Sequence, residues 1–213
     1  MSFDIICFDC DSTLSKIEGI DELGRRSGLF DQLVVLTNAA MNGELALEDV
    51  YGRRLNLIKP DQAQMEWLAD LYIAEIVEGV KEVFSTLLAQ NKQVHIISGG
   101  IRQAILPLAD LLGISSTHVH AVDVLFNDDG SYKDFDQQSP LAKTGGKAII
   151  CKQLLNGDKS MVMVGDGKTD LEAKNAGATV IGFGGVAQRE IVLQQADRFV
   201  TETSLAAVLP YIL

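Results

Sequence analysis

The sequence predicts an α/β protein, with a central parallel sheet between two layers of helices and a small helical bundle inserted after the first strand. Short apolar runs alternate with helical patterns over residues 76–213, as in consecutive βαβ units. Residues 14–75 contain only helical spacing. A chain of 213 residues suits one core with a modest insertion. We therefore expect a Rossmann-like three-layer core from residues 1–13 and 76–213, and a bundle from residues 14–75.

The first strand is predicted at residues 5–8, which are all apolar and directly precede Asp9 and Asp11. These two carboxylates then lie at the C-terminal end of a buried strand. In open parallel sheets ligands bind at that edge, because loops surround a crevice there and helix N-termini face it. In such a place one carboxylate can attack a phosphorus atom while the other transfers a proton.

The segment after the first strand reads as helical throughout. Apolar residues recur at helical spacing in three groups, at residues 20–36, 47–55 and 65–72. Gly43 separates the first two groups, and Pro60 with Asp61 is a start signal for the third helix. The pattern predicts a small bundle without strands.

The next segment returns to alternating helices and strands. Residues 80–90 have the spacing of an amphipathic helix, and residues 93–100 form an apolar run that ends in a glycine-rich turn. A helix is expected over residues 101–112, where Pro107 should kink or restart it. Residues 119–135 are predicted to form a β-hairpin around residues 127–130.

The last third of the chain continues the alternation. Helices are expected over residues 148–155, 187–195 and 203–209, and strands over residues 161–166, 179–182 and 198–201. This order implies a parallel sheet with right-handed crossovers.

Composition limits the classes of partner. A net charge of −11 argues against nucleic acid and anionic membranes, which both recruit basic patches. No run of 18 apolar residues and no signal-peptide pattern is present, so we expect a soluble, cytoplasmic protein. The cysteines give no zinc or disulfide framework, because Cys7 and Cys10 should point to opposite faces of a strand.

Polar residues at three strand ends suit one reaction. Asp9 with Asp11, Ser98 before two glycines, and Asp166 each follow an apolar run, and Lys147 follows a pair of glycines. Phosphoryl transfer needs a nucleophile, a cation, donors for the phosphoryl oxygens and a proton for the leaving oxygen. Carboxylates and a carbonyl are ligands that suit Mg²⁺, and Lys147 and Ser98 suit anionic oxygens.

These segments resemble a known family. Residues 9–13, 98–100, Lys147 and residues 165–170 are similar to the four ordered motifs of the haloacid dehalogenase superfamily of phosphatases. Residues 18–23, 41–43, 53–55 and 181–185 resemble stretches of the branch that acts on phosphoserine, and the likeness covers nearly the whole chain. Two positions depart from the pattern: Cys10 replaces a more usual aliphatic residue, and Asn42 stands where glycine is frequent.

The resemblance implies Mg²⁺-dependent hydrolysis of O-phospho-L-serine to L-serine and phosphate, the last step of serine biosynthesis. Asp9 would form an aspartyl phosphate, and Asp11 would protonate the serine oxygen and then activate water. The side chains of Asp9 and Asp166 and the carbonyl of Asp11 would hold the metal. Asp170 would orient Lys147 or a water on the metal.

The resemblance also implies a substrate site beneath the bundle, which would act as a cap. Glu18 would face the substrate ammonium, Arg54 its carboxylate, and Ser98 with Gly99 the phosphoryl group. The implied binding set also contains Met41, Asn42, Gly100 and Thr169. Lys143 stays open as an alternative to Lys147, and Arg53 as an alternative to Arg54.

Other functions share the core residues. A phosphatase for a different small phosphate ester would differ only in the bundle, and a phosphotransferase would pass the phosphoryl group to an alcohol. A receiver-like regulatory domain also carries an acidic cluster and a lysine at a sheet edge. The inserted bundle argues against a receiver, which must stay open to a partner. A monomer or a homodimer suits the enzymatic alternatives.

Overall fold

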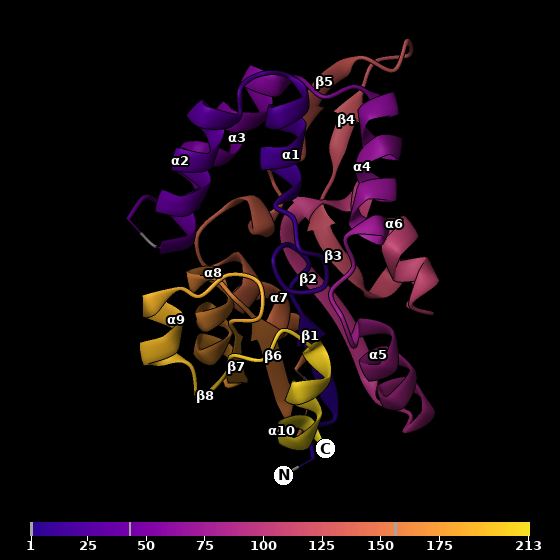
Figure 1. Cartoon of the computed structure of the whole chain (residues 1–213), viewed down its shortest axis with the longest axis vertical. Coiled ribbons are helices and arrows are strands. Elements are labelled where there is room, and N and C mark those ends of the chain that lie inside the picture. The colour runs from indigo at the N-terminus through magenta and orange to yellow at the C-terminus, as the bar shows by residue number, and fades with distance from the viewer. Residues whose placement is uncertain (1, 43, 156) are drawn as a thin grey trace.

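The core is a six-stranded sheet in the order β3-β2-β1-β6-β7-β8, and every neighbouring pair of strands is parallel (Figure 1). The computed structural model describes residues 2–42, 44–155 and 157–213, so the expected break at Gly43 lies outside the described residues. The strands are β1 (Ile5–Phe8), β2 (Gln93–Ile101), β3 (Val119–Val122), β6 (Met161–Gly165), β7 (Thr179–Phe183) and β8 (Arg198–Val200). The predicted α/β class is confirmed.

Helices cover both faces of this sheet. Successive residues of a strand point to opposite faces. In β1, Phe8 packs against Phe84 of α5, with ring centroids 5.0 Å apart, and the Cys7 thiol lies against Cys151 of α7. The core helices are α5 (Val80–Ala89), α6 (Arg102–Leu111), α7 (Gly146–Leu154), α8 (Lys168–Leu171), α9 (Glu190–Gln195) and α10 (Leu209–Ile212).

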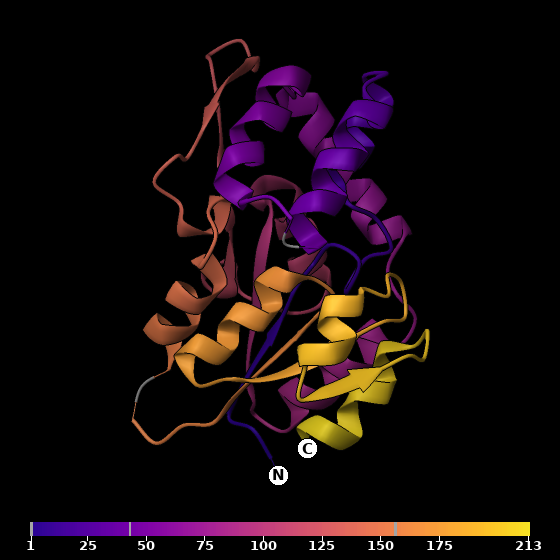
Figure 2. The same ribbon diagram turned by 90° about the vertical axis from the view of Figure 1, so that its left-hand side faces the viewer.

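Within the described residues, four helices between β1 and α5 lie beyond the C-terminal end of the sheet (Figures 1 and 2). They are α1 (Gly19–Arg26), α2 (Phe30–Asn42), α3 (Leu47–Ile58) and α4 (Gln62–Ala74). The sequence predicted three, because the apolar spacing runs on from residue 20 to 36. The structure divides this stretch at Gly28, whose φ of 72° is left-handed and ends α1. Helix α4 starts as expected, because Asp61 and Gln64 form a reciprocal capping box.

Two other expectations need correction. The hairpin is shorter than predicted: β4 (Val124–Phe126) pairs with β5 (Tyr132–Phe135), whereas residues 119–122 form the edge strand β3 beside β2. Val119 and Val122 are buried, so packing places them in the main sheet. Helix α6 also runs through Pro107 without a restart. The short helical turns over residues 168–176 were not expected.

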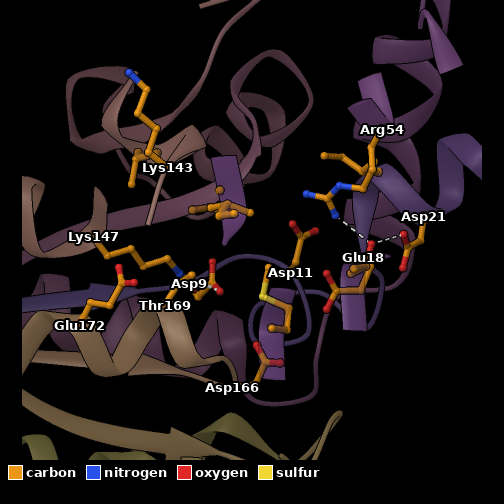
Figure 3. A pocket seen from close by; sticks show the side chains of 17 residues that line it. Asp9, Asp11, Glu18, Asp21, Arg54, Lys143, Lys147, Asp166, Thr169 and Glu172 are labelled. Carbon is orange, nitrogen blue, oxygen red and sulfur yellow. Dashed lines mark hydrogen bonds and ion pairs between the residues drawn. The ribbon is translucent and has the colours of Figure 1, made fainter. Parts of the chain in front are cut away.

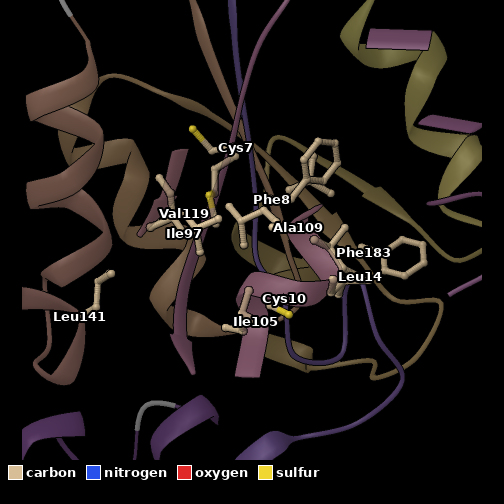
Figure 4. Packing of buried hydrophobic residues seen from close by; sticks show 14 of the residues in the cluster. Cys7, Phe8, Cys10, Leu14, Ile97, Ile105, Ala109, Val119, Leu141 and Phe183 are labelled. Atoms are coloured by element: carbon tan, nitrogen blue, oxygen red, sulfur yellow. The ribbon is translucent and has the colours of Figure 1, made fainter. Parts of the chain in front are cut away.

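The turn that follows β1 is anchored in the apolar core. Cys10 and Leu14 are fully buried and pack among core residues of the sheet and α6 (Figure 4). The Leu14 amide donates to the Cys10 carbonyl at 2.9 Å, and Ser12 has a φ of 51°. The turn begins between Asp9 and Asp11. Because it is tight and buried, it fixes the directions in which these two side chains point. Within the described residues, no helix has the length and apolar content needed to span a bilayer.

Candidate active site

Asp9 and Asp11 point from this turn toward different neighbours. The Asp9 amide extends the sheet by donating to the Val164 carbonyl at 2.9 Å, and its carboxylate accepts from the Cys10 amide at 2.7 Å. The Asp11 carboxylate instead accepts from the Gly19 amide at 2.9 Å and the Tyr72 hydroxyl at 2.6 Å. Asp9 is therefore held by the core, and Asp11 by the helical bundle.

The end of β2 brings Ser98 and two glycines to the same place. Ser98 is buried, and its hydroxyl accepts from the Gly100 amide at 3.0 Å. A Cβ atom on Gly100 would lie 2.9 Å from a carboxylate oxygen of Asp11, so only glycine allows this approach. Ser98 and Gly99 line the pocket that contains both aspartates.

Lys147 is buried between two carboxylates. Its Nζ lies 2.8 Å from Asp9 and 2.6 Å from Asp170. The glycines before it are needed for this position: Gly145 has a φ of 83°, and a Cβ on Gly146 would lie 2.0 Å from the Pro140 carbonyl. Helix α7 can therefore start close to the preceding turn. Lys143, the alternative lysine, also lines the pocket but is exposed at its rim.

A buried acidic trio suits a divalent cation. Asp9, Asp166 and Asp170 each offer a carboxylate oxygen, and these oxygens lie within 4.8 Å of one another. Hard oxygen ligands are what Mg²⁺ and similar cations prefer, so the donor set fits such an ion. The side chain of Asp11 is outside this trio, whereas Asp170, expected behind the metal ligands, belongs to it. The second Asp170 oxygen accepts from the Gly167 amide at 3.0 Å.

The pocket lies between the sheet edge and the bundle (Figure 3). Most of the expected residues line it: Asp9, Asp11, Glu18, Met41, Arg54, Ser98, Gly99, Lys147, Asp166 and Thr169. Three do not. Asp170 is fully buried beneath it, and Gly100 lies behind Asp11. Asn42 is exposed and its amide donates to Glu44, because it is rotated from Met41 by one helical step.

The bundle contributes Glu18 and Arg54, the two residues expected to face the substrate ammonium and carboxylate, to the pocket. Glu18 accepts a hydrogen bond of 2.8 Å from the Ser12 hydroxyl. Arg54 is only 3% exposed and donates from Nη1 to the Thr37 hydroxyl at 2.8 Å. Arg53, the alternative arginine, is exposed. The structure therefore brings Arg54 into the pocket.

Arg189 also lies at the site, although no role was expected for it. Its Nε donates to Asp166 at 3.1 Å, and its Nη2 lies 3.4 Å from Glu18. The helix predicted over residues 187–195 includes Arg189, but α9 starts at Glu190 and Arg189 is its N-cap. The signal that could have identified it is its position after β7, at the same edge of the sheet as the other strand ends. Asp21 and Thr37, which also line the pocket, were missed as well.

Burial and neighbouring charges change the pKa values of the ionisable side chains in the site. Burial, together with the nearby Asp9 carboxylate, raises the pKa of Asp11 to about 7. Burial and the charge of Glu18 raise the pKa of Asp166 to about 7 as well. Burial alone would lower the pKa of Lys147, but Asp170 and Asp9 raise it above its ordinary value. Lys147 therefore stays charged, and Asp11 can carry a proton near neutral pH.

These shifts predict how a cation stabilises the protein. Unfolded carboxyls titrate near pH 4, so between about pH 4 and 7 the folded chain binds more protons than the unfolded chain. The free energy of unfolding of cation-free protein should therefore fall as pH rises across this range. A divalent cation replaces those protons, so its stabilising effect should grow with pH.

Thermal unfolding at about pH 5 and about pH 8, with excess Mg²⁺ or with a chelator, checks this prediction. We expect Mg²⁺ to raise Tm more at the higher pH. An equal rise at both pH values would contradict it.

Comparisons with known proteins identify one family. Residues 3–177 match the family model described as haloacid dehalogenase-like hydrolase. The chain is 38% identical to the phosphoserine phosphatase of Bos taurus over 203 residues, which cover 94% of this chain and 90% of that protein.

Solved structures agree with the sequence relatives. A phosphoserine phosphohydrolase-like protein from Francisella tularensis has a TM-score of 0.88 at 26% identity, with both chains fully covered. A structure described as a phospho-aspartyl intermediate analogue of phosphoserine phosphatase has a TM-score of 0.84 at 26% identity, also over both full chains.

Proposed function

Because this chain belongs to the haloacid dehalogenase-like hydrolases, we propose that it hydrolyses O-phospho-L-serine to L-serine and phosphate through an aspartyl phosphate on Asp9. One observation carries the substrate assignment. A buried guanidinium, Arg54, and a carboxylate, Glu18, line the same pocket as the Asp9 and Lys147 pair. In a phosphate ester with a carboxylate and an ammonium group, the carboxylate matches Arg54, the ammonium group matches Glu18 and the phosphate matches Lys147.

Asp9, Asp166 and the carbonyl of Asp11 would hold Mg²⁺, with Asp170 supporting the site. A cation held there would neutralise charge on the phosphoryl oxygens. The acidic trio supports this part of the proposal. Lys147 and the hydroxyl of Ser98 add donors for the same oxygens, and the Gly99 backbone approaches from the same strand end.

The first chemical step uses Asp9 and Asp11. A carboxylate oxygen of Asp9, oriented by the Cys10 amide and Lys147, attacks phosphorus. The bond from phosphorus to the serine oxygen breaks, and that oxygen takes its proton from Asp11. The raised pKa of Asp11, about 7, suits this role as an acid near neutral pH.

The second step reverses the role of Asp11. As a carboxylate it removes a proton from a water molecule, which attacks phosphorus in the aspartyl phosphate. The bond from phosphorus to the Asp9 oxygen breaks, so phosphate leaves and Asp9 is restored. The bundle of residues 14–75 would act as a cap that excludes bulk water. Hydrogen bonds from Thr144 to Glu48 of α3, at 2.7 and 2.8 Å, join it to the core at the pocket's rim.

The remaining expected residues would contact the amino-acid part of the substrate or its surroundings. Glu18 would face the ammonium group and Arg54 the carboxylate. Met41 and Thr169 also line the pocket, and Gly100 leaves room for Asp11. Asn42 has no place in this proposal, because its side chain lies outside the pocket.

Phosphate release from a panel of esters tests the assignment. With Mg²⁺, kcat/KM for O-phospho-L-serine should exceed that for O-phosphoethanolamine by about 10- to 100-fold. The reason is that a hydrogen bond to a charged group contributes about 1.5 to 3 kcal/mol. A different preferred ester would contradict the substrate. Transfer to an added alcohol in place of water would favour a phosphotransferase, and no release from any ester would favour the receiver-like alternative.

A further inference from the structure

Arg54 is a buried cation without an acidic partner among the described residues. Its side chain is 3% exposed, yet none of the ion pairs in the described residues includes it. Its Nε has no hydrogen-bond partner there, and its Nη1 donates to Thr37 alone. Burying an unpaired charge is costly, so this arrangement points to an anionic ligand as the missing partner.

The Thr37 hydroxyl lies between Arg54 and Asp21. Thr37 of α2 accepts from Arg54 of α3 at 2.8 Å, and it donates its own proton to Asp21 of α1 (Figure 3). A hydroxyl has one proton and two lone pairs. Because the proton is committed to Asp21, a lone pair of Thr37 must face the guanidinium. Asp21 thereby determines which way the hydroxyl points.

The three side chains are held tightly. Thr37 is 2% exposed and Asp21 is 4% exposed, and each comes from a different helix of the bundle. A direct pair between Asp21 and Arg54 would occupy guanidinium N–H groups that a substrate carboxylate needs. With Thr37 between them, Asp21 offsets part of the buried charge without occupying Nε. The guanidinium keeps free donors on the side of the pocket.

We propose that Asp21 and Thr37 are positioning residues that hold Arg54 ready for the carboxylate of the substrate. This inference rests on the proposed function, in which Arg54 binds that carboxylate. It assigns Asp21 no direct contact with the substrate. The competing role for Asp21, contact with the substrate ammonium beside Glu18, makes a different prediction.

Two esters separate these roles. O-phospho-L-serine carries an ammonium group and a carboxylate, whereas O-phosphoethanolamine carries the ammonium group alone. The quantity to measure is the ratio of kcat/KM for the first ester to that for the second. Variants Thr37→Val and Asp21→Asn should each lower this ratio by about tenfold, the effect of one hydrogen bond to a charged group. Asp21→Asn keeps the shape of the side chain but weakens its hold on the hydroxyl.

Three controls make the test specific. Thr37→Ser keeps the hydroxyl and should retain most of the ratio. Thr86→Val, on α5 away from the pocket, should not change it. On an Arg54→Met background, Thr37→Val should have no further effect on the ratio, because the residue acts through Arg54.

The possible outcomes separate the positioning role from its alternatives. A ratio that survives Thr37→Val would overturn the positioning role alone. An equal fall for both esters in Asp21→Asn would show contact with the ammonium group or general damage, and would also overturn it. An unmodified enzyme without any preference for the carboxylate-bearing ester would contradict the proposed function as well.

Discussion

An enzyme in which Asp9 is replaced by asparagine is expected to hydrolyse O-phospho-L-serine at least about 1,000-fold more slowly than the unmodified enzyme. The amide is a poor nucleophile and ligand, whereas the shape of the side chain is preserved. Lys147 keeps a second partner, Asp170 at 2.6 Å, so the buried cation is not left unpaired. The loss should therefore appear in turnover and not in folding. Phosphate release under saturating substrate measures it.

The control for this variant is Asp70→Asn, an exposed aspartate on α4. It should keep full activity. Circular dichroism and thermal unfolding should show that the Asp9→Asn protein is folded. A folded Asp9→Asn protein with more than about a tenth of the original kcat would contradict a nucleophilic role for Asp9.

Replacing Lys147 with methionine is expected to cost both stability and activity. The change leaves Asp9 and Asp170 buried without the cation that lies 2.8 and 2.6 Å from them. Removing one partner of a buried ion pair costs about 3–5 kcal/mol. For a chain of this size that corresponds to a fall in Tm of about 6–20 °C. Catalysis should fall as well, because Lys147 lies 2.8 Å from Asp9 and is proposed to bind the phosphoryl group.

The matched variant is Lys143→Met, at the exposed lysine of the same segment. Its stability should stay within about 0.5 kcal/mol of the unmodified protein, as for most surface substitutions. Thermal unfolding in the presence of a chelator compares the two without a contribution from bound cation. A larger loss in Lys143→Met than in Lys147→Met would assign the buried role to the wrong lysine.

The inner strands of the sheet were predictable because they are buried on both faces. Such strands are short, continuous apolar runs, and the four residues of β1 are all buried. Strand β3 was harder, because Asp123 alone separates it from β4. Nothing in that local sequence shows that residues 119–122 pair with β2, whereas residues 124–126 turn back on β5. The pairing depends on packing with distant residues.

In the site too, some residues were predictable from local sequence and others were not. Asp9 and Asp166 follow strands and Ser98 lies near the end of β2. Parallel strands bring their ends together, so local sequence suffices to place these residues. Lys147 was preferred to Lys143 because the family that the sequence resembles places its lysine after two glycines. Thr37 was not predictable, because its contact with Arg54 depends on how helices α2 and α3 pack. Arg189 was missed although it follows β7, because no local pattern indicates its contact with Asp166. Helical spacing places Arg54, and not Arg53, on the apolar side of residues 47–55, and the packed bundle has Arg54 buried and Arg53 exposed.

The most direct test of the whole account is to look for the phosphoryl group on Asp9. The enzyme is mixed with O-phospho-L-serine and Mg²⁺, quenched in acid during turnover, digested and examined by mass spectrometry. We expect one phosphoryl group on the peptide that contains Asp9, with more of it in Asp11→Asn, where attack by water is slowed. Rapid phosphate release without any phosphorylated Asp9, or with the label on another residue, would contradict the account.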